Sequence, residues 1–291
     1  MYSLFTEKNS ESSVIERLEN CSNERFKKVM SSAIRHLHAF IKEVEPSMEE
    51  WRKAIDFLTA TGQICDDKRQ EWVLASDTLG ASMLIESINH RSVDGATEAT
   101  VLGPFYVEGA PERSMGESIC LDDKGSIGTM RGCVLDTNGN PIERATIDVW
   151  QTNDDGFYNV QQMNIQPTMN MRGKFVTGSD GAFHFLTSKP KSYSIPTDGP
   201  VGKMLTKMGR HPFRPAHIHF IASAEGFQTL VTHIFVEGDK YLDSDAVFGV
   251  KESLVVPFID QGETWTANFD IVLKTSENKT SWTCPHPPNA E

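Results

Sequence analysis

The chain lacks several features that mark common protein classes. Its 291 residues contain no apolar run near the roughly 20 residues that a membrane helix needs, so no spanning segment is expected. The first 20 residues have no basic stretch followed by an apolar core, so no signal peptide is expected. Positive charge is scarce: 28 Lys and Arg face 40 Asp and Glu, for a formal net charge of −12. Nucleic acids and anionic membranes select basic surfaces, so neither is expected as a partner.

Cysteine is also sparse. The five cysteines are odd in number, scattered, and form no CxxC pair: Cys21, Cys65, Cys120, Cys133 and Cys284. This argues against a disulfide framework or a thiolate metal site and indicates reduced thiols in the cytoplasm. The remaining composition is that of an ordinary globular protein, with 38% hydrophobic and 23% charged residues.

The first third has the pattern of helices. Apolar residues recur at helical spacing from Phe26 to Val44, and Pro46 should end this helix. Ser47 and Glu50 form a capping box for a second helix that runs to Gly62. A third is predicted from a cap at Asp66 or Asp67 through Leu79 and Met83 towards Ile88.

After about residue 100 the chain changes to short β-prone runs separated by turn residues. A hairpin is predicted from residues 133–135 and 145–150, joined by a turn at Asn138-Gly139. Further strands are expected at 174–177, 181–186, 216–221, 230–237 and 267–273. The predicted fold is mainly β, with a helical domain at 1–100 for dimerisation and a β-sandwich catalytic domain at 101–291.

One strand carries residues typical of a metal site. His217 and His219 are two residues apart, so both imidazoles should point from the same face. Alone, the pair also fits two half-buried structural histidines. Two of the five tyrosines, Tyr158 and Tyr193, lie near turns, where an aromatic ring is usually structural.

With these residues in view, the sequence resembles the intradiol ring-cleaving dioxygenases, the family of catechol and hydroxyquinol 1,2-dioxygenases. The similarity covers nearly the whole chain. The segments that carry it are GPFYVEGAP (103–111), the run from Gly132 to Tyr158, RGKFVTGSDGAFHF (172–185), KSYSIPTDGPVGKML (191–205), GRHPFRPAHIHF (209–220), THIFVEGDKYLDSDAVFGVK (232–251) and SLVVPF (253–258).

The resemblance implies a ferric iron held by Tyr158, Tyr193, His217 and His219. In the family pattern Tyr193 and His219 are axial, and Tyr193 leaves the metal when the diol binds and takes a substrate proton. Chemistry agrees with this donor set: phenolates are hard anionic donors that favour Fe(III), and two phenolates plus hydroxide balance its three positive charges.

The resemblance also places Arg214 beside the substrate, where a permanent cation stabilises anionic species. A salt bridge to a local carboxylate is the alternative. His233 stands where catechol-cleaving relatives have glutamine, and faces the pocket or is an ordinary strand histidine. The expected pocket walls are Leu79, Ser82, Val101, Leu102, Gly103, Pro104, Phe105, Ile195 and Pro196.

Ser82 offers a hydroxyl for a third ring OH, and the segment around His233 resembles the hydroxyquinol branch. The expected reaction is therefore cleavage of hydroxyquinol (1,2,4-trihydroxybenzene) by O₂ to 3-hydroxy-cis,cis-muconate, the tautomer of maleylacetate. Catechol or chlorocatechol is the alternative substrate. A homodimer through the N-terminal helices, with a bound lipid, is expected from the family.

Three other classes compete with this interpretation. A cupin-type metalloenzyme would use His217, His219 and Glu225, but the spacing to Glu225 is long and the tyrosines have no role. A non-catalytic β-sandwich binding module would tolerate loss of Tyr158 or Tyr193. In the third alternative, the N-terminal helices form an independent partner-binding domain.

Overall fold

The computed structural model describes residues 4–66, 69–91 and 95–276. It separates into two compact units, residues 1–60 and 61–291, and each is described by itself. The expected boundary between a helical and a catalytic domain near residue 100 stays a prediction. Cys284 lies outside the described residues. No helix in the described ranges has the length and apolarity to cross a membrane.

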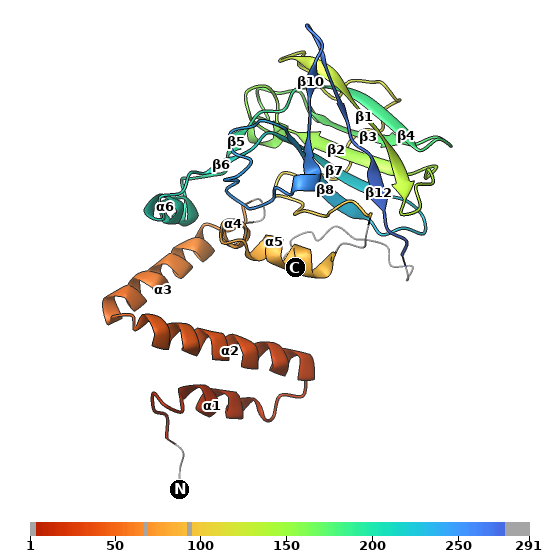
Figure 1. The fold of residues 1–291 in the computed structure, drawn as a ribbon. Helices are drawn as coiled ribbons and strands as arrows, with labels where there is room; N and C mark the ends of the chain where they lie inside the picture. Colours follow the sequence, from red (N-terminus) through yellow and green to blue (C-terminus); the bar gives the residue numbers. More distant parts are fainter. Residues whose placement is uncertain (1–3, 67–68, 92–94, 277–291) are drawn as a thin grey trace. The chain divides into compact units, whose positions relative to one another are not determined.

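Helices form the first unit. They are α1 (Ser10–Ile15), the short 3₁₀ helix η1 (Glu16–Leu18), α2 (Glu24–Val44) and most of α3 (Met48–Gln63) (Figure 1). The Asn23 side chain caps α2 by accepting from the Phe26 amide at 2.9 Å. The predicted capping box at Ser47 and Glu50 is present: each side chain accepts from the other's backbone N–H.

The predicted third helix is instead two helices, α4 (Glu71–Thr78) and α5 (Ala81–Asn89). Gly80 lies between them with φ 74°, a left-handed conformation that breaks the helix. Asp66 does not cap α4: it accepts from the Arg69 amide one turn earlier, and the cap position is Gln70. Asp67 lies outside the described residues. Since α4 and α5 are separate, residues 79 and 82 do not share a continuous helix face.

The strands of the second unit form two five-stranded sheets, as the fold prediction requires. In one sheet β3, β2, β7, β8 and β9 follow in that order; in the other, β10, β11, β1 and β12 are neighbours and β4 pairs with β1. A small third sheet pairs β5 with β6. The bounds are β1 Ile127–Asp136, β2 Thr146–Gln151, β3 Arg172–Val176, β4 Ala182–Ser188, β5 Tyr193–Ser194, β6 Phe213–Arg214, β7 His217–Ser223, β8 Leu230–Val236, β9 Val255–Val256, β10 Ile259–Asp260, β11 Trp265–Asn268 and β12 Ile271–Leu273.

Two strand predictions need correction. The turn at Asn138-Gly139 exists, with the Asp136 amide bonded to the Asn140 carbonyl, but β1 and β2 enter different sheets and make no hairpin. The single strand predicted at 267–273 is two strands, β11 and β12, separated by Phe269 and Asp270. Two antiparallel strands of similar length look alike in sequence whether they pair with each other or cross to the facing sheet.

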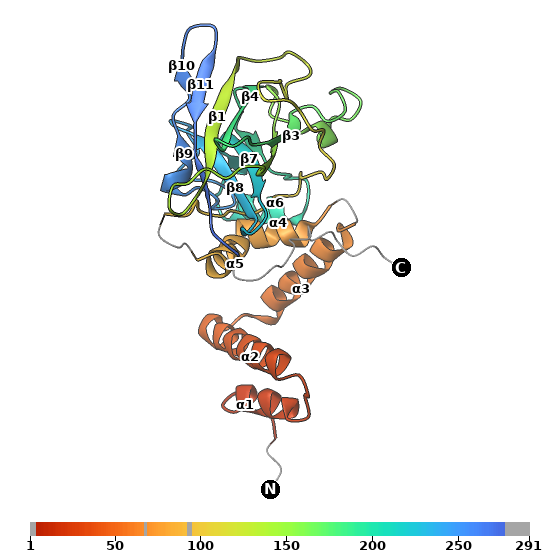
Figure 2. The same cartoon turned by 90° about the vertical axis from the view of Figure 1, so that its right-hand side faces the viewer.

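One apolar core joins the two sheets. Met130, Val134 and Phe185 from one sheet meet Ile147, Ile218 and Phe220 from the other in a single buried cluster. Three shorter helices belong to this unit: α6 (Pro200–Lys207), η2 (Asn159–Gln161) and η3 (Glu252–Leu254). Figure 2 shows α4 and α6 together at one end of the sandwich, where the buried Glu71 carboxylate accepts from the Val201 amide at 3.0 Å. This hydrogen bond joins α4 to α6.

Candidate metal centre and substrate pocket

The two histidines of β7 lie as their spacing predicts. Both are buried, and their Nε2 atoms are 3.2 Å apart. The Nδ1 of His217 lies 2.7 Å from the Pro215 carbonyl oxygen, which accepts its proton. A neutral imidazole with its proton on Nδ1 presents a lone pair on Nε2, so His217 is held in the form that binds metals.

Both predicted tyrosines join this pair. Tyr158 opens η2, after a loop in which Asn153 accepts from the Phe157 amide; Tyr193 lies on β5, opposite Arg214 of β6. The Tyr158 oxygen is 2.8 Å from His219 Nε2 and 3.4 Å from His217 Nε2. The Tyr193 ring lies 5.4 Å from that of Tyr158, and their side chains are hydrogen bonded. Four donors from three separate segments therefore face one point.

Burial sets the protonation of these groups. It lowers the pKa of His217 and of His219 well below the usual value, and the charge of Arg214 adds to the effect. Burial also raises the pKa of the Tyr158 phenol well above its usual value, and the neighbouring Tyr193 adds to it. The imidazoles are therefore neutral, and a phenolate at Tyr158 requires a compensating positive charge.

This arrangement fits a metal ion. Two imidazole nitrogens and the Tyr158 oxygen lie at contact distance among buried side chains, and because burial disfavours the charged form, Tyr158 ionises only if a cation lies beside it. Hard oxygen donors with two imidazoles suit a highly charged first-row ion such as iron.

Arg214 makes the predicted salt bridge and also lies next to the candidate centre. Its guanidinium pairs with the buried Asp245, with Nε at 3.1 Å from Oδ1, so the predicted salt bridge exists. Burial alone would lower the pKa of Arg214, but Asp245 outweighs it and the pKa is raised. Its Nη1 also lies 3.4 Å from His217 Nε2, at the edge of the donor cluster. Asp245 therefore anchors a permanent cation beside the candidate centre.

His233 is a third buried imidazole at this place. It stands opposite His219 across β7 and β8, and nitrogens of His217, His219 and His233 all lie within 4.8 Å of one another. Its Nδ1 is hydrogen bonded to the hydroxyl of Thr100. Its Nε2 has no hydrogen-bond partner in the part of the chain that the structure describes. His233 is therefore fixed through one ring nitrogen, while the other is available to bond a further group. Glu225, needed by a cupin site, is exposed after β7.

The loop at 101–105 lies against the tyrosines. Leu102 and Phe105 pack with Tyr158 and Tyr193, and the Phe105 ring stacks on that of Tyr158 at 4.5 Å. Gly103 has φ 77°, and a Cβ there would lie 3.3 Å from His219 Cε1. Val101 is half-buried and Pro104 exposed in the same loop. The structure thus brings the predicted loop to the side chains that were predicted as metal ligands.

The predicted helical wall lies at the end of α4. Leu79 follows the last residue of this helix, Thr78, and is 58% exposed. Leu74 of α4 packs with Ile195 and Val247. The role of Leu79 as a pocket wall stays a prediction. Pro196 follows Ile195 and is half-buried.

Ser82 contacts the Ser76 hydroxyl at 2.8 Å and also bonds to Asp77, a carboxyl that the sequence analysis missed. Asp77 is buried, which raises its pKa, while the charge of Arg214 acts to lower it. Asp77 therefore lies within electrostatic reach of Arg214, and Ser82 is bonded to it. Asp77 stands between Ser76 and Thr78, so no apolar pattern in the sequence marked it as buried.

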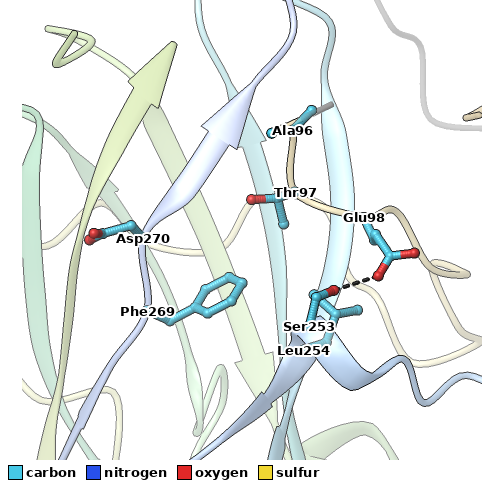
Figure 3. A pocket seen from close by; sticks show the side chains of 8 residues that line it. Ala96, Thr97, Glu98, Ser253, Leu254, Phe269 and Asp270 are labelled. Carbon is cyan, nitrogen blue, oxygen red and sulfur yellow. Dashed lines mark hydrogen bonds between the residues drawn. The ribbon is translucent and has the colours of Figure 1, made fainter. Parts of the chain in front are cut away.

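A surface hollow of about 360 Å³ lies elsewhere (Figure 3). Thr97, Glu98, Ser253 and Asp270 are among its lining residues, and Glu98 accepts from the Ser253 hydroxyl. None of the predicted ligands lines it.

Comparison with known proteins agrees with this geometry. The family model described as "Dioxygenase" matches residues 101–275, and "Catechol dioxygenase N terminus" matches 23–97. A hydroxyquinol 1,2-dioxygenase of Rhizobium sp. (strain MTP-10005) is 55% identical over 92% of this chain and 96% of its own.

Solved structures of similar proteins cover almost the whole chain. A hydroxyquinol 1,2-dioxygenase from Pseudomonas putida DLL-E4 has a TM-score of 0.89 at 46% identity, over 93% of this chain and 99% of its own. A catechol 1,2-dioxygenase from Pseudomonas arvilla C-1 has a TM-score of 0.80 at 28% identity, over 96% and 95%. The chain belongs to the intradiol ring-cleavage dioxygenase family.

Proposed function

We propose that this protein is a ferric-iron intradiol dioxygenase that cleaves hydroxyquinol with O₂ to 3-hydroxy-cis,cis-muconate, the tautomer of maleylacetate. The observation that carries the proposal is the convergence of Tyr158, Tyr193, His217 and His219 on one buried point. The preference for hydroxyquinol rests on the relatives at 55% and 46% identity, against 28% for the catechol-cleaving structure.

The four side chains would hold Fe(III). When bound, ferric iron acts as a Lewis acid that draws electron density from a chelated diol and makes its ring carbon reactive towards O₂. Two phenolates offset most of the ion's charge in a site that water does not reach. The Tyr193 phenolate would serve as the base that accepts one proton of the diol.

The remaining side chains would position the diol. Arg214, fixed by Asp245, stabilises the anionic substrate beside His217. His233 lies beside the same cluster, and its Nε2, which has no partner among the described residues, would bond a substrate oxygen. The apolar slot for the ring would be formed by Leu79, Val101, Leu102, Gly103, Pro104, Phe105, Ile195 and Pro196, with Leu74 packed against Ile195.

A third ring hydroxyl separates hydroxyquinol from catechol. In our proposal Asp77, held by Ser82, accepts a hydrogen bond from that hydroxyl. A buried acceptor left without a partner would cost catechol about 1–3 kcal/mol relative to hydroxyquinol.

We further propose a cytoplasmic homodimer. The described cysteines are free thiols, and a row of exposed apolar side chains, including Leu37, Phe40 and Val44, runs along α2. Such a row is the expected face of a helix that packs on a second copy, with room for the lipid expected from the family.

The test begins with the purified protein as it is. Metal analysis should find iron, and the visible spectrum should show the phenolate-to-iron charge-transfer band that makes such proteins wine-red. Oxygen uptake should be faster with hydroxyquinol than with catechol or chlorocatechol. A colourless protein would contradict the tyrosinate site and return the cupin alternative, and faster turnover of catechol would reject the substrate.

A further inference from the structure

Arg172, at the start of β3, is a buried cation outside the predicted site. Its side chain is 1% exposed. Within the described ranges no carboxylate forms an ion pair with it, and the nearby Asp148 pairs instead with Lys174 at 3.6 Å. A buried positive charge is costly unless something compensates it. The positive charge of Arg172 therefore requires a negative group nearby.

The hydrogen bonds of Arg172 end on both sides of Tyr158. Nε donates to the Asn159 Oδ1 at 2.7 Å, and Nη2 donates to the Phe105 carbonyl oxygen at 2.7 Å. Asn159 follows Tyr158 in the chain, and the Phe105 ring stacks on the Tyr158 ring. One guanidinium thus joins the residue next to Tyr158 with the residue stacked on it.

The sheet fixes Arg172 in this position. Trp150 of β2 is opposite Arg172 on one side and opposite His219 on the other, so the three lie in one row across β3, β2 and β7. The Trp150 ring stacks on His219 at 4.5 Å. The backbone pairing thus links the position of Arg172 to that of His219 through Trp150.

The charges of Arg172 and Tyr158 interact. Burial lowers the pKa of Arg172 to about 10, which leaves it charged near neutral pH, and a negative charge on Tyr158 acts in the opposite direction. Arg172 in turn favours the ionised form of Tyr158. Each group supplies the charge that the other lacks.

We propose that Arg172 is a positioning residue for Tyr158: it clamps the ring through Phe105 and Asn159 and supplies the fixed positive charge that stabilises the metal-bound phenolate. This rests on the proposed function, because Tyr158 carries that negative charge when it binds iron.

The charge has a spectroscopic consequence. A cation beside a phenolate lowers the energy of its electrons, so removing it makes transfer of charge to ferric iron easier. The visible band should then move to longer wavelength. Ionising Tyr158 to hold the metal would also cost more, so iron should be lost more readily, by about 10- to 100-fold in affinity as for other supports of metal ligands.

The experiment uses three variants of the iron-loaded protein. Arg172→Met removes the charge and both hydrogen bonds at similar length. Arg172→Lys keeps the positive charge but loses the planar guanidinium that donates to two groups at once. Asn159→Ala removes one bond and leaves the charge. Arg113→Met is the matched control, because Arg113 is a neighbouring cation that donates to the Arg172 carbonyl oxygen at 3.2 Å, away from Tyr158.

The visible maximum and the rate of iron loss to a chelator are measured for each. Arg172→Met should shift the band to longer wavelength and lose iron at least about tenfold faster. Arg172→Lys and Asn159→Ala should keep the band near wild type while losing iron faster. Arg113→Met should change neither.

An unshifted band in Arg172→Met, or an equal shift in Arg172→Lys, overturns the proposal, because packing rather than charge would then be the cause. If Arg172→Met does not fold, the band of Arg172→Lys and Asn159→Ala decides: a shift in either contradicts the assignment. Failure of the proposed function gives a different result, a wild-type protein with no phenolate band.

Discussion

In most proteins apolar side chains are buried and polar ones exposed, and two regions of this molecule depart from that rule in opposite ways. One is helix α2, and the other is the row of Arg172, Trp150, His219 and His233 across β3, β2, β7 and β8. Along α2 no residue is buried, and large apolar side chains such as Leu37 and Phe40 are more than half exposed. In the row, Arg172, His219 and His233 are polar and almost fully buried. Exposed apolar residues need a partner molecule, whereas buried polar residues need one another or a bound ion.

The largest effect is expected from His219→Ala, which tests whether the buried polar row binds an ion. It removes an imidazole donor from the buried cluster, so we expect iron affinity to fall by more than about a hundredfold, beyond the loss typical of outer supports. Metal analysis after dialysis measures it, together with loss of the visible band. Wild-type iron content in this variant would remove His219 from the ligand set.

Arg214→Ala tests whether the buried cation acts on the substrate or on the fold. We expect near-native iron content with turnover slower by about 10²–10³-fold, because an anionic species loses its neighbouring charge. Stability should also fall, by about 3–5 kcal/mol, since Asp245 is left buried and unpaired.

Asp245→Asn is the matched variant for this pair. It breaks the same ion pair but leaves the guanidinium beside His217, so its turnover should fall much less than that of Arg214→Ala. Steady-state oxygen uptake and thermal unfolding of both variants separate the two roles. Equal turnover losses would mean that Arg214 acts through the fold alone.

On the helical side, Phe40→Asp places a charge in the exposed apolar row of α2. We expect a smaller particle by sedimentation, with the visible band and iron content unchanged, because the donor cluster lies in the other compact unit. Ala39→Asp adds the same charge at an exposed neighbour outside the row and should stay the size of wild type. Equal sizes for all three proteins would argue against dimerisation through this row.

The smallest effect is expected from Asn23→Ala. The Asn23 side chain accepts from the Phe26 amide, and loss of such a cap typically costs about 1 kcal/mol. Hydrogen exchange of the first-turn amides of α2 should become faster by about fivefold. The neighbouring Ser22→Ala serves as control, and unchanged exchange in Asn23→Ala would show that the cap contributes nothing.

Sequence patterns predicted elements better than connections. Periodicity identified α2 and α3 and the Ser47 cap, because these depend on residues three or four apart. The hairpin of residues 133–150 and the long helix through Leu79 were wrong. Sheet partners depend on distant contacts, and the effect of Gly80 depends on a backbone angle that its sequence neighbours do not set.

The same limit applies to the site. The motifs predicted that Tyr158 and Tyr193 would meet the β7 histidines, and the structure brings them together; their role as ligands stays a proposal. Asp77 and Asp245 were missed, because burial alone distinguishes them from the many surface carboxylates of an acidic chain. Arg172 was within a quoted motif, yet its contacts across the sheet are invisible in sequence.

Gly103 restricts how this enzyme can be re-engineered for bulkier rings. A side chain there would be strained by the φ of 77°, and its Cβ, at 3.3 Å from His219 Cε1, would require the imidazole to give way slightly. A mutant library that varies this position would therefore disturb the His219 imidazole together with the ring slot. Leu102 and Phe105 of the same loop carry replaceable side chains, and diversity directed at those two positions leaves the Gly103 backbone unchanged.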